Sequence, residues 1–225
     1  MARKVAAIFA HPDDEVLGCG GAMAWHASRG DEARILLLAT GLRSRGPAGD
    51  GEIARLQDEA RKAAECLGIK SVAFSDFPDN AMDSVPLLDV VKAVEVFLAG
   101  FAADTIYTHH DGDLNVDHLV VHRAVMTARR PLPGSAPFEI LACEVNSSTE
   151  WGLPSQSPFV PTDFLDISGY VDRKAKALEQ YTGEIRPWPH PRSVEGVKAL
   201  ARWRGAQCGA EAAEAYRLLR RLRRP

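Results

Sequence analysis

A short apolar run that ends in a cluster of acids, close to the start of the chain, restricts the fold more than any other feature. Residues 5–10 are continuously apolar, and residues 11–15 (His-Pro-Asp-Asp-Glu) follow at once. A run this short, at the head of alternating strand and helix patterns, predicts a buried parallel strand. Pro12 ends that strand, and the acids suit a helix N-terminus. Open α/β sheets carry their functional sites at such strand ends.

The rest of the chain continues the alternation. Strands are expected at residues 33–39, 70–75, 104–108, 138–145 and 163–167, and helices at residues 16–29, 52–67, 87–98, 170–181 and 194–204. A further helix, capped by Asn115 or Asp117, is expected to end at Ala128. The alternation predicts a Rossmann-like α/β fold, in which helices flank a mostly parallel sheet of strand order 3-2-1-4-5.

We expect a single domain, with a Rossmann-like core over residues 1–130 and a C-terminal extension over residues 131–225. Residues 16–21 bring three glycines into the first helix, which indicates close packing of that helix on the sheet. Residues 146–161 are expected to form an ordered loop, either a lid or a subunit contact. Residues 216–224 are basic, and we expect a helix or a tail there.

Composition excludes several classes of function. The chain has 225 residues, of which 46% are hydrophobic and 25% charged, as in an ordinary globular protein. Its net charge of -3 gives no reason to expect a nucleic-acid partner. No apolar stretch approaches the length of a membrane span or a secretion signal. The four cysteines lack metal-motif spacing, so we expect reduced thiols and a cytoplasmic location. The oligomeric state stays open, and a homo-oligomer is one alternative.

Two clusters of histidine and carboxylate are expected to meet. His11 and Asp14 are three residues apart and can reach one ion from a turn, and their donor atoms suit zinc. A third ligand must come from elsewhere, and residues 115–118 (Asn-Val-Asp-His) are the best candidate. These residues follow the fourth strand, which neighbours the first in the expected order. Two histidines and one carboxylate leave a place for water, as catalytic zinc sites do, and Asp13 could point at that water.

Simpler interpretations of these residues remain open. Acids at a helix start often act only as caps, and a histidine at a strand end is often only hydrogen-bonded. His118 and His122 share one helix face, so both could bind metal; we expect His118 alone, with His122 packed a turn deeper. Carboxylates that could orient a ligating imidazole lie nearby: Asp111, Asp113 and Asp117.

The motif at residues 10–15 (Ala-His-Pro-Asp-Asp-Glu), followed by Gly-Cys-Gly-Gly, resembles the signature of the PIG-L/LmbE-like zinc-dependent de-N-acetylases. Further blocks follow in the order of that family over nearly the whole chain: residues 67–68, 78–80, 112–118, 147–151, 189–193 and 204–205. The resemblance implies one zinc ion per chain, with other divalent metals as alternatives. It implies hydrolysis of an N-acetyl group, usually on a glucosamine-containing sugar. By the same similarity His11, Asp14 and His118 would hold the metal, and Asp13 would be the general base.

One position departs from the pattern of the family. Many members have a histidine where this chain has Asn115, and the resemblance implies that the histidine assists catalysis. Asparagine can donate a hydrogen bond to an oxyanion but cannot supply a proton. We therefore expect Asp13 to handle both proton transfers, or His190 to take the missing role.

Four further residues are expected to face a substrate: Arg43, Asp79, Asn80 and Arg192. Three prolines in residues 187–192 exclude a helix and could hold His190 and Arg192 over the crevice; a rigid surface loop is the alternative. The expected function is metal-dependent removal of an N-acetyl group from an N-acetylglucosamine-type sugar conjugate. The alternatives are an amidase acting on a non-sugar N-acyl substrate and a non-catalytic module that binds a sugar nucleotide.

Overall fold

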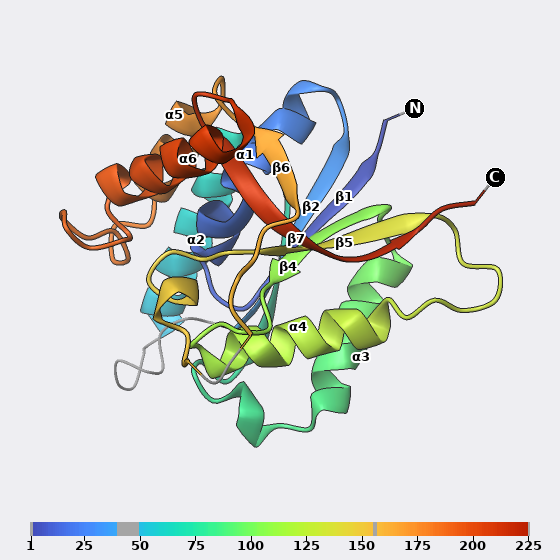
Figure 1. Cartoon of the computed structure of the whole chain (residues 1–225). Helices are drawn as coiled ribbons and strands as arrows, with labels where there is room; N and C mark the ends of the chain where they lie inside the picture. The colour runs from blue at the N-terminus through green and yellow to red at the C-terminus, as the bar shows by residue number, and fades with distance from the viewer. Residues whose placement is uncertain (1, 40–49, 155–156, 225) are drawn as a thin grey trace.

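A computed structural model describes residues 2–39, 50–154 and 157–224 (Figure 1). Its elements in chain order are β1 (Lys4–Phe9), α1 (Asp14–Ser28), β2 (Glu32–Ala39), α2 (Asp50–Leu67), β3 (Ser71–Phe77), the 3-10 turn η2 (Met82–Ser84), α3 (Leu87–Ala99), β4 (Thr105–His109), α4 (Val116–Ala128), β5 (Phe138–Cys143), the 3-10 turn η3 (Thr149–Trp151), β6 (Asp163–Asp166), α5 (Val171–Leu178), α6 (Val194–Cys208) and β7 (Ala213–Leu222). One seven-stranded sheet runs in the order β3-β2-β1-β4-β5-β7-β6. The first five strands are parallel, and β7 runs antiparallel to both of its neighbours. The predicted α/β class and strand order are confirmed.

The sheet separates two hydrophobic cores. Helices α1, α2, α5 and α6 cover one face, and α3 and α4 cover the other (Figure 1). In the central strand β1, Val5, Ala7 and Phe9 pack into the first core, while Ala6 and Ile8 pack into the second. Burial on both faces explains why the β1 sequence is continuously apolar rather than alternating.

The expectation of a basic helix or tail at residues 216–224 is wrong, because residues 216–222 belong to β7. The strand inserts between β5 and β6, and a register shift between Ile140 and Leu141 of β5 interrupts its alternation. Because such a bulge adds an extra residue to β7, the alternation of buried and exposed side chains along this strand cannot be recognised in the sequence. The charges are also paired: Arg221 lies 2.8 Å from Glu139, and Arg220 donates to two carbonyls at the end of α4.

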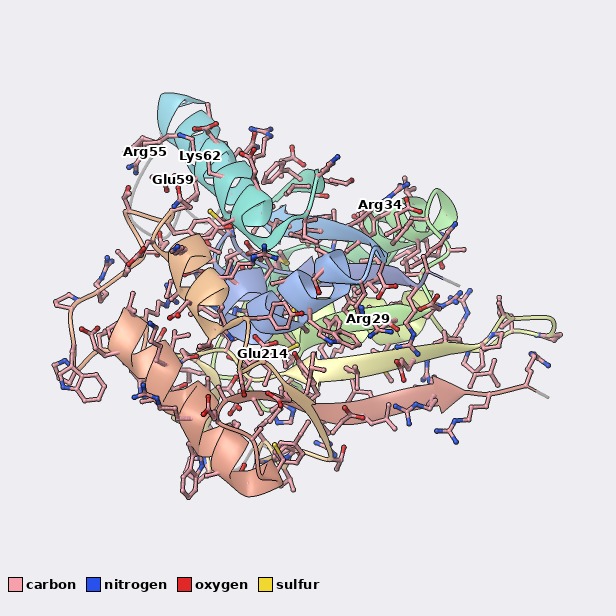
Figure 2. The ribbon with its side chains drawn as sticks, turned by 90° about the horizontal axis from the view of Figure 1, so that it is seen from above. Arg29, Arg34, Arg55, Glu59, Lys62 and Glu214 are labelled. Carbon is pink, nitrogen blue, oxygen red and sulfur yellow. The ribbon has the colours of Figure 1, made fainter. Side chains whose placement is uncertain are left out.

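Helix α1 is broken at Cys19, where φ is -146° and ψ is 22°. Glu214 of β7 reaches this break, and its carboxylate accepts the N–H groups of Gly21 and Ala22, both at 2.7 Å. Figure 2 labels Glu214 among the side chains around this helix. A Cβ atom on Gly18 would lie 2.9 Å from Phe9 Cε1 of β1, which confirms the predicted close packing of this helix on the sheet. A side chain from a distant strand therefore caps the second segment of α1.

The ends of β1, β3, β4 and β5 open toward one edge of the sheet, and the loops with the candidate residues follow these ends. The chain termini lie at the opposite edge (Figure 1). Within residues 2–39, 50–154 and 157–224, every helix is too short or too polar to cross a bilayer.

Candidate metal centre

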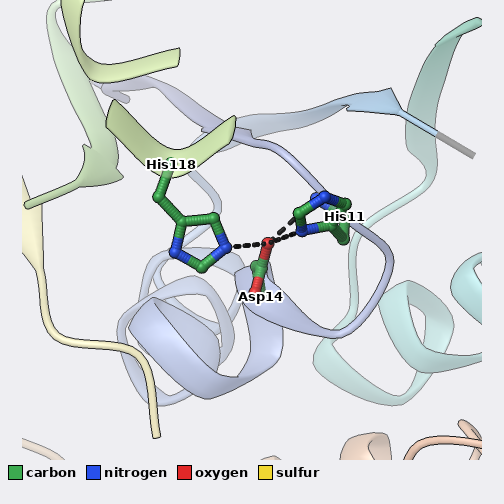
Figure 3. Close-up of side chains that lie close together, drawn as sticks. All are labelled: His11, Asp14 and His118. Carbon is green, nitrogen blue, oxygen red and sulfur yellow. Dashed lines mark hydrogen bonds and ion pairs between the residues drawn. The ribbon is translucent and has the colours of Figure 1, made fainter. Parts of the chain in front are cut away.

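His11, Asp14 and His118 converge on one point (Figure 3). Asp14 Oδ2 lies 3.2 Å from His11 Nδ1 and 3.2 Å from His118 Nε2. The two imidazole rings are 5.4 Å apart between centroids, and all three side chains are buried. Residues more than 100 positions apart in the sequence are thus brought within reach of one atom.

The local backbone explains how His11 and Asp14 come to face the same way. Strand β1 ends before His11, and Asp13 adopts a φ of 108°, which turns the chain into α1. Glu15 Oε2 accepts the N–H of Asp13 at 3.1 Å and so supports this turn. A non-glycine residue at such a φ costs about 1–3 kcal/mol, and such strain clusters at functional sites.

His118 is held from the other side by β4 and by the first turn of α4. Asn115 is the N-cap, and its side chain accepts the N–H of Asp117 at 2.9 Å, which confirms one of the two predicted caps. The ring of His109 stacks on that of His118, with 3.7 Å between centroids and 16° between planes. Because the N–H of Ala10 donates to His109 Nε2 at 2.8 Å, β1 and β4 are also linked beneath the centre.

Each of the two histidines directs its other nitrogen at a carboxylate. His11 Nε2 lies 2.9 Å from Asp117 Oδ2 and 3.3 Å from Asp79 Oδ1. His118 Nδ1 lies 3.1 Å from Asp113 Oδ2. Carboxylates in this position fix the tautomer and ring orientation of ligating histidines.

The donor set fits a zinc ion. Ligand atoms bound tetrahedrally at about 2.0–2.1 Å lie about 3.3 Å apart, and both measured separations from Asp14 are close to this value. Two other groups of acids and histidines share His11 or His118. In those groups Asp117 accepts two backbone N–H groups, and Asp113 accepts one N–H and two hydroxyls, so both oxygens of each carboxylate are used. Asp14 Oδ2 accepts one backbone N–H, that of His11 at 2.9 Å. The group formed by His11, Asp14 and His118 is therefore the best candidate for a metal.

The surrounding charge favours a cation. Burial, the largest influence, lowers the pKa of His11, but Asp117 and Asp14 outweigh it and raise the pKa to about 10. Burial likewise lowers the pKa of His118, while Asp14 and Asp113 raise it to about 9. Burial acts to raise the pKa of Asp14, but the charge of His118 and the neighbouring imidazoles hold it well below the usual value. A divalent cation bound here would interact with the same carboxylates that otherwise stabilise the protonated imidazoles of His11 and His118.

Asp13 lies beside this group and contacts Arg192. Arg192 Nη1 is 3.1 Å from Asp13 Oδ2 and 3.2 Å from Glu184 Oε2. Arg192 Nε donates to Ser147 Oγ at 2.5 Å, which ties the loop after β5 to the segment before α6. Burial raises the pKa of Asp13 well above its usual value, and the Arg192 charge opposes that rise.

Asn80 and Asn115 contact each other across the edge of the centre. Asn115 Nδ2 donates to Asn80 Oδ1 at 2.9 Å, and Asn80 Nδ2 donates to Asp79 Oδ1 at 3.1 Å. The backbone N–H of Asn80 donates to Asp117 Oδ2 at 2.6 Å. The turn after β3 is thereby fastened to the N-terminus of α4.

Other predicted residues contact groups outside the three candidate ligands. Asp111 faces His110 and Arg217 at 3.1 Å and 3.5 Å. His122 directs its Nδ1 at the His109 carbonyl oxygen at 2.8 Å, as expected for a packed histidine. The described contacts of His190 are with the Trp151 ring and the backbone N–H of Arg192. Arg43 lies outside the described residues.

Several further residues support the centre, and none of them was predicted from the sequence. Tyr181 donates to Glu15 Oε1 at 2.5 Å, and Ser148 Oγ donates to Asp113 Oδ1. Burial raises the pKa of Glu15 to about 7, although the Tyr181 hydrogen bond acts against it. The signal for Ser148 was its place in residues 147–151, one of the blocks in family order. Tyr181 carries no local signal, because only the packing of α5 on α1 brings it near.

The chain is similar to a known protein family and to curated proteins. The family model described as GlcNAc-PI de-N-acetylase, PIG-L, matches residues 6–129. The uncharacterized deacetylase YaiS of Escherichia coli (strain K12) is 32% identical over an alignment of 180 positions, and the alignment covers 78% of this chain and 91% of that protein. The 4-oxalmesaconate hydratase of Pseudomonas putida is 29% identical over an alignment of 217 positions, and the alignment covers 88% of this chain and 81% of that protein.

A solved structure shares the whole fold. The N,N'-diacetylchitobiose deacetylase from Pyrococcus horikoshii superposes with a TM-score of 0.77 at 20% sequence identity, covering 97% of this chain and 84% of that chain. The family model spans more than half of the chain, and the Escherichia coli relative is covered almost completely. The chain therefore belongs to the PIG-L family of de-N-acetylases.

Proposed function

We propose that the protein is a zinc-dependent hydrolase that removes the N-acetyl group from an N-acetylglucosamine-type sugar conjugate. The observation that carries the proposal is the convergence of His11, Asp14 and His118 on one point, with Asp13 beside them. Membership of the PIG-L family supports the reaction class. The free cysteines, among them the exposed Cys208, support a cytoplasmic location.

His11, Asp14 and His118 would hold the ion, and other divalent metals could take the same donors. Bound zinc supplies Lewis acidity, which lowers the pKa of water and polarises an amide carbonyl. Asp113 and Asp117, together with Asp79, would orient the two imidazoles through their second nitrogens. Asp79 is thus proposed as a positioning residue as well as part of the crevice lining.

Asp13 is proposed to accept a proton from the attacking water as the oxygen bonds to the acetamide carbonyl carbon. Arg192 would hold the Asp13 carboxylate in place through its contact at 3.1 Å. As the C–N bond breaks, the leaving amine nitrogen takes a proton from Asp13 or, alternatively, from His190. The products are acetate and a free amino sugar.

Asn115 would donate to the developing oxyanion, and Asn80 would face the sugar at the same edge. Because Asn115 Nδ2 now donates to Asn80 Oδ1, this role requires the two amides to exchange partners when substrate enters. The substrate would also meet Arg192, and Arg43 is proposed as a further contact.

A second candidate function is the hydration of a carbon–carbon double bond. It is favoured by the 29% identity to the Pseudomonas putida hydratase, which extends over 88% of this chain. Adding water to a conjugated acid also needs a positioned water and a base, so the same residues would serve.

An acetate-release screen of the zinc-loaded protein separates these functions. We expect acetate from N-acetylglucosamine conjugates, none from simple N-acetyl amides, and loss of the activity with a chelator. Release from the simple amides alone would instead indicate the amidase. Loss of ultraviolet absorbance from 4-oxalmesaconate without any acetate release would indicate the hydratase, and no turnover of any compound at full zinc occupancy would indicate a binding module.

A further inference from the structure

Two exposed tryptophans line an open, mostly apolar depression of about 490 Å³. Trp151 of η3 is 49% exposed, and Trp188 of the proline-rich segment is 60% exposed. The lining consists of Trp151 and residues 186–191, and we call it the aromatic shelf. Large aromatic side chains exposed together in this way are typical of ligand-binding surfaces.

Both walls of the aromatic shelf are fastened to the candidate metal centre. On one side, Thr149 Oγ1 donates to Asp113 Oδ2 at 2.8 Å, and Asp113 in turn contacts His118. On the other side, Arg192 directly follows the shelf residues and contacts Asp13 at 3.1 Å. The walls meet where the rings of Trp151 and His190 lie 5.9 Å apart. The segments that form both walls of the aromatic shelf thus contact the candidate centre.

The lining combines flat apolar surface with hydrogen-bond donors. The indole rings and three prolines of residues 187–191 supply the apolar part, and Arg186 and His190 supply N–H groups. His190 Nδ1 accepts the backbone N–H of Arg192 at 3.1 Å, which places the proton of the neutral ring on Nε2. A pyranose has the matching chemistry, because it presents an apolar C–H face and a rim of hydroxyls. An alkyl chain would offer no acceptor to the Nε2–H group of His190, whereas Arg186 Nη1 already donates to the carbonyl oxygens of Gly183 and Ile185.

We propose that the aromatic shelf binds a second sugar ring of the substrate, linked on the aglycone side of the reacting N-acetyl sugar. The assignment rests on the proposed function for the identity of the reacting group. It narrows the substrate class from any N-acetylglucosamine conjugate to one that carries a further pyranose.

The test compares one-ring and two-ring ligands on the zinc-loaded protein. Titration calorimetry with glucosamine and with its β-1,4-linked disaccharide measures binding without turnover. We expect the disaccharide to bind about tenfold more tightly, as a stacking contact of this kind allows. W188A and W151A should remove that advantage, while W203A, which alters an exposed tryptophan of α6 outside the lining, should keep it.

Acetate release from N-acetylglucosamine and N,N'-diacetylchitobiose supplies the second readout. W188A should raise KM for the two-ring substrate about tenfold and leave KM for the one-ring substrate unchanged. Equal affinity for both ligands in the unaltered protein, or an advantage that survives W188A, would overturn the proposal even if acetate is released. The proposal would also be overturned if the two tryptophans increased the affinity for an aryl glucosaminide but not for the disaccharide. If the protein prefers the disaccharide but releases no acetate, the sugar-binding role of the aromatic shelf would be supported and the proposed deacetylase activity would be excluded.

Discussion

Asp13 is the residue at which backbone strain and buried charge coincide. Its φ of 108° and its burial both oppose folding, and they are offset by the N–H contact to Glu15 and the ion pair with Arg192. Neighbouring Asp14 is buried as well, but its carboxylate faces two imidazoles. Adjacent aspartates thus have separate roles, one beside the metal donors and one among them.

Asp13→Asn should keep the metal and lose most of the rate. The amide oxygen can still accept from Arg192, but the amide cannot take a proton, so we expect kcat to fall about 10²–10⁴-fold. Acetate release and metal content per chain, measured on the same preparation, check this. Turnover at the parental rate would exclude Asp13 as the base.

Asp117→Asn should weaken zinc binding. The Asp117 carboxylate accepts N–H groups from Asn80 and Met82 while it contacts His11 Nε2, and an amide offers only one oxygen for these contacts. We expect zinc affinity or activity to fall about 10–100-fold. Asp111→Asn is the matched control, because Asp111 faces His110 and Arg217 instead. Equal effects of the two substitutions would contradict the positioning role of Asp117.

At the scale of elements, the broken helix α1 connects the candidate centre with β7, which lies next to the edge strand β6. Its first turn carries Asp14, and its second segment begins where Glu214 accepts two backbone N–H groups. Lys174 of α5 lies 2.7 Å from the same carboxylate and donates to the carbonyl oxygen of Leu17. Strand β7 and helix α5 together therefore hold the helix that presents Asp14.

Glu214→Ala should destabilise the protein more than an average surface change. The substitution leaves the buried Lys174 ammonium without its counter-charge, a loss of about 3–5 kcal/mol that would lower Tm by roughly 10 °C. Glu211→Ala, an exposed change just before β7, is the control and should leave Tm nearly unchanged. Thermal unfolding followed by circular dichroism measures both, and matching Tm values would rule out the capping role of Glu214.

At the scale of the whole molecule, a metal would join two segments that the sheet brings together. His11 follows β1 and His118 lies in α4 after β4, and β1 and β4 are neighbours at the middle of the sheet. The two hydrophobic cores lie on either side of these strands. Because these cores hold the strands together, we expect the metal to add to the stability of the fold rather than to be required for folding.

Zinc should raise Tm without being required for folding. At a free zinc concentration of 100 times Kd, binding adds about 2.7 kcal/mol, which corresponds to a rise in Tm of roughly 5–10 °C. His118→Ala should abolish the rise. His122→Ala, on the same helix but hydrogen-bonded to the His109 carbonyl oxygen, should retain it. A rise that disappears in His122→Ala and persists in His118→Ala would reverse the assignment.

Local sequence was sufficient for the order of the five parallel strands and for the two clusters at the strand ends. Continuous apolar runs identify strands buried on both faces, and a histidine or acid directly after such a run lies at the carboxyl edge because the chain direction fixes it. For the same reason residues 11–15 and 115–118 could be expected to meet. The predicted cap at Asn115 was also local, since a capping side chain acts within its own turn.

Only the tertiary structure decided the contacts made by the C-terminal part. The contact of Arg192 with Asp13, the hydrogen bond from Tyr181 to Glu15 and the capping of α1 by Glu214 join residues that are more than 160 positions apart. The bulge in β7 concealed a strand that the sequence indicated as a helix or tail. Periodicity and motif spacing report what a residue does within its own element, whereas these partners are selected by how separate elements pack.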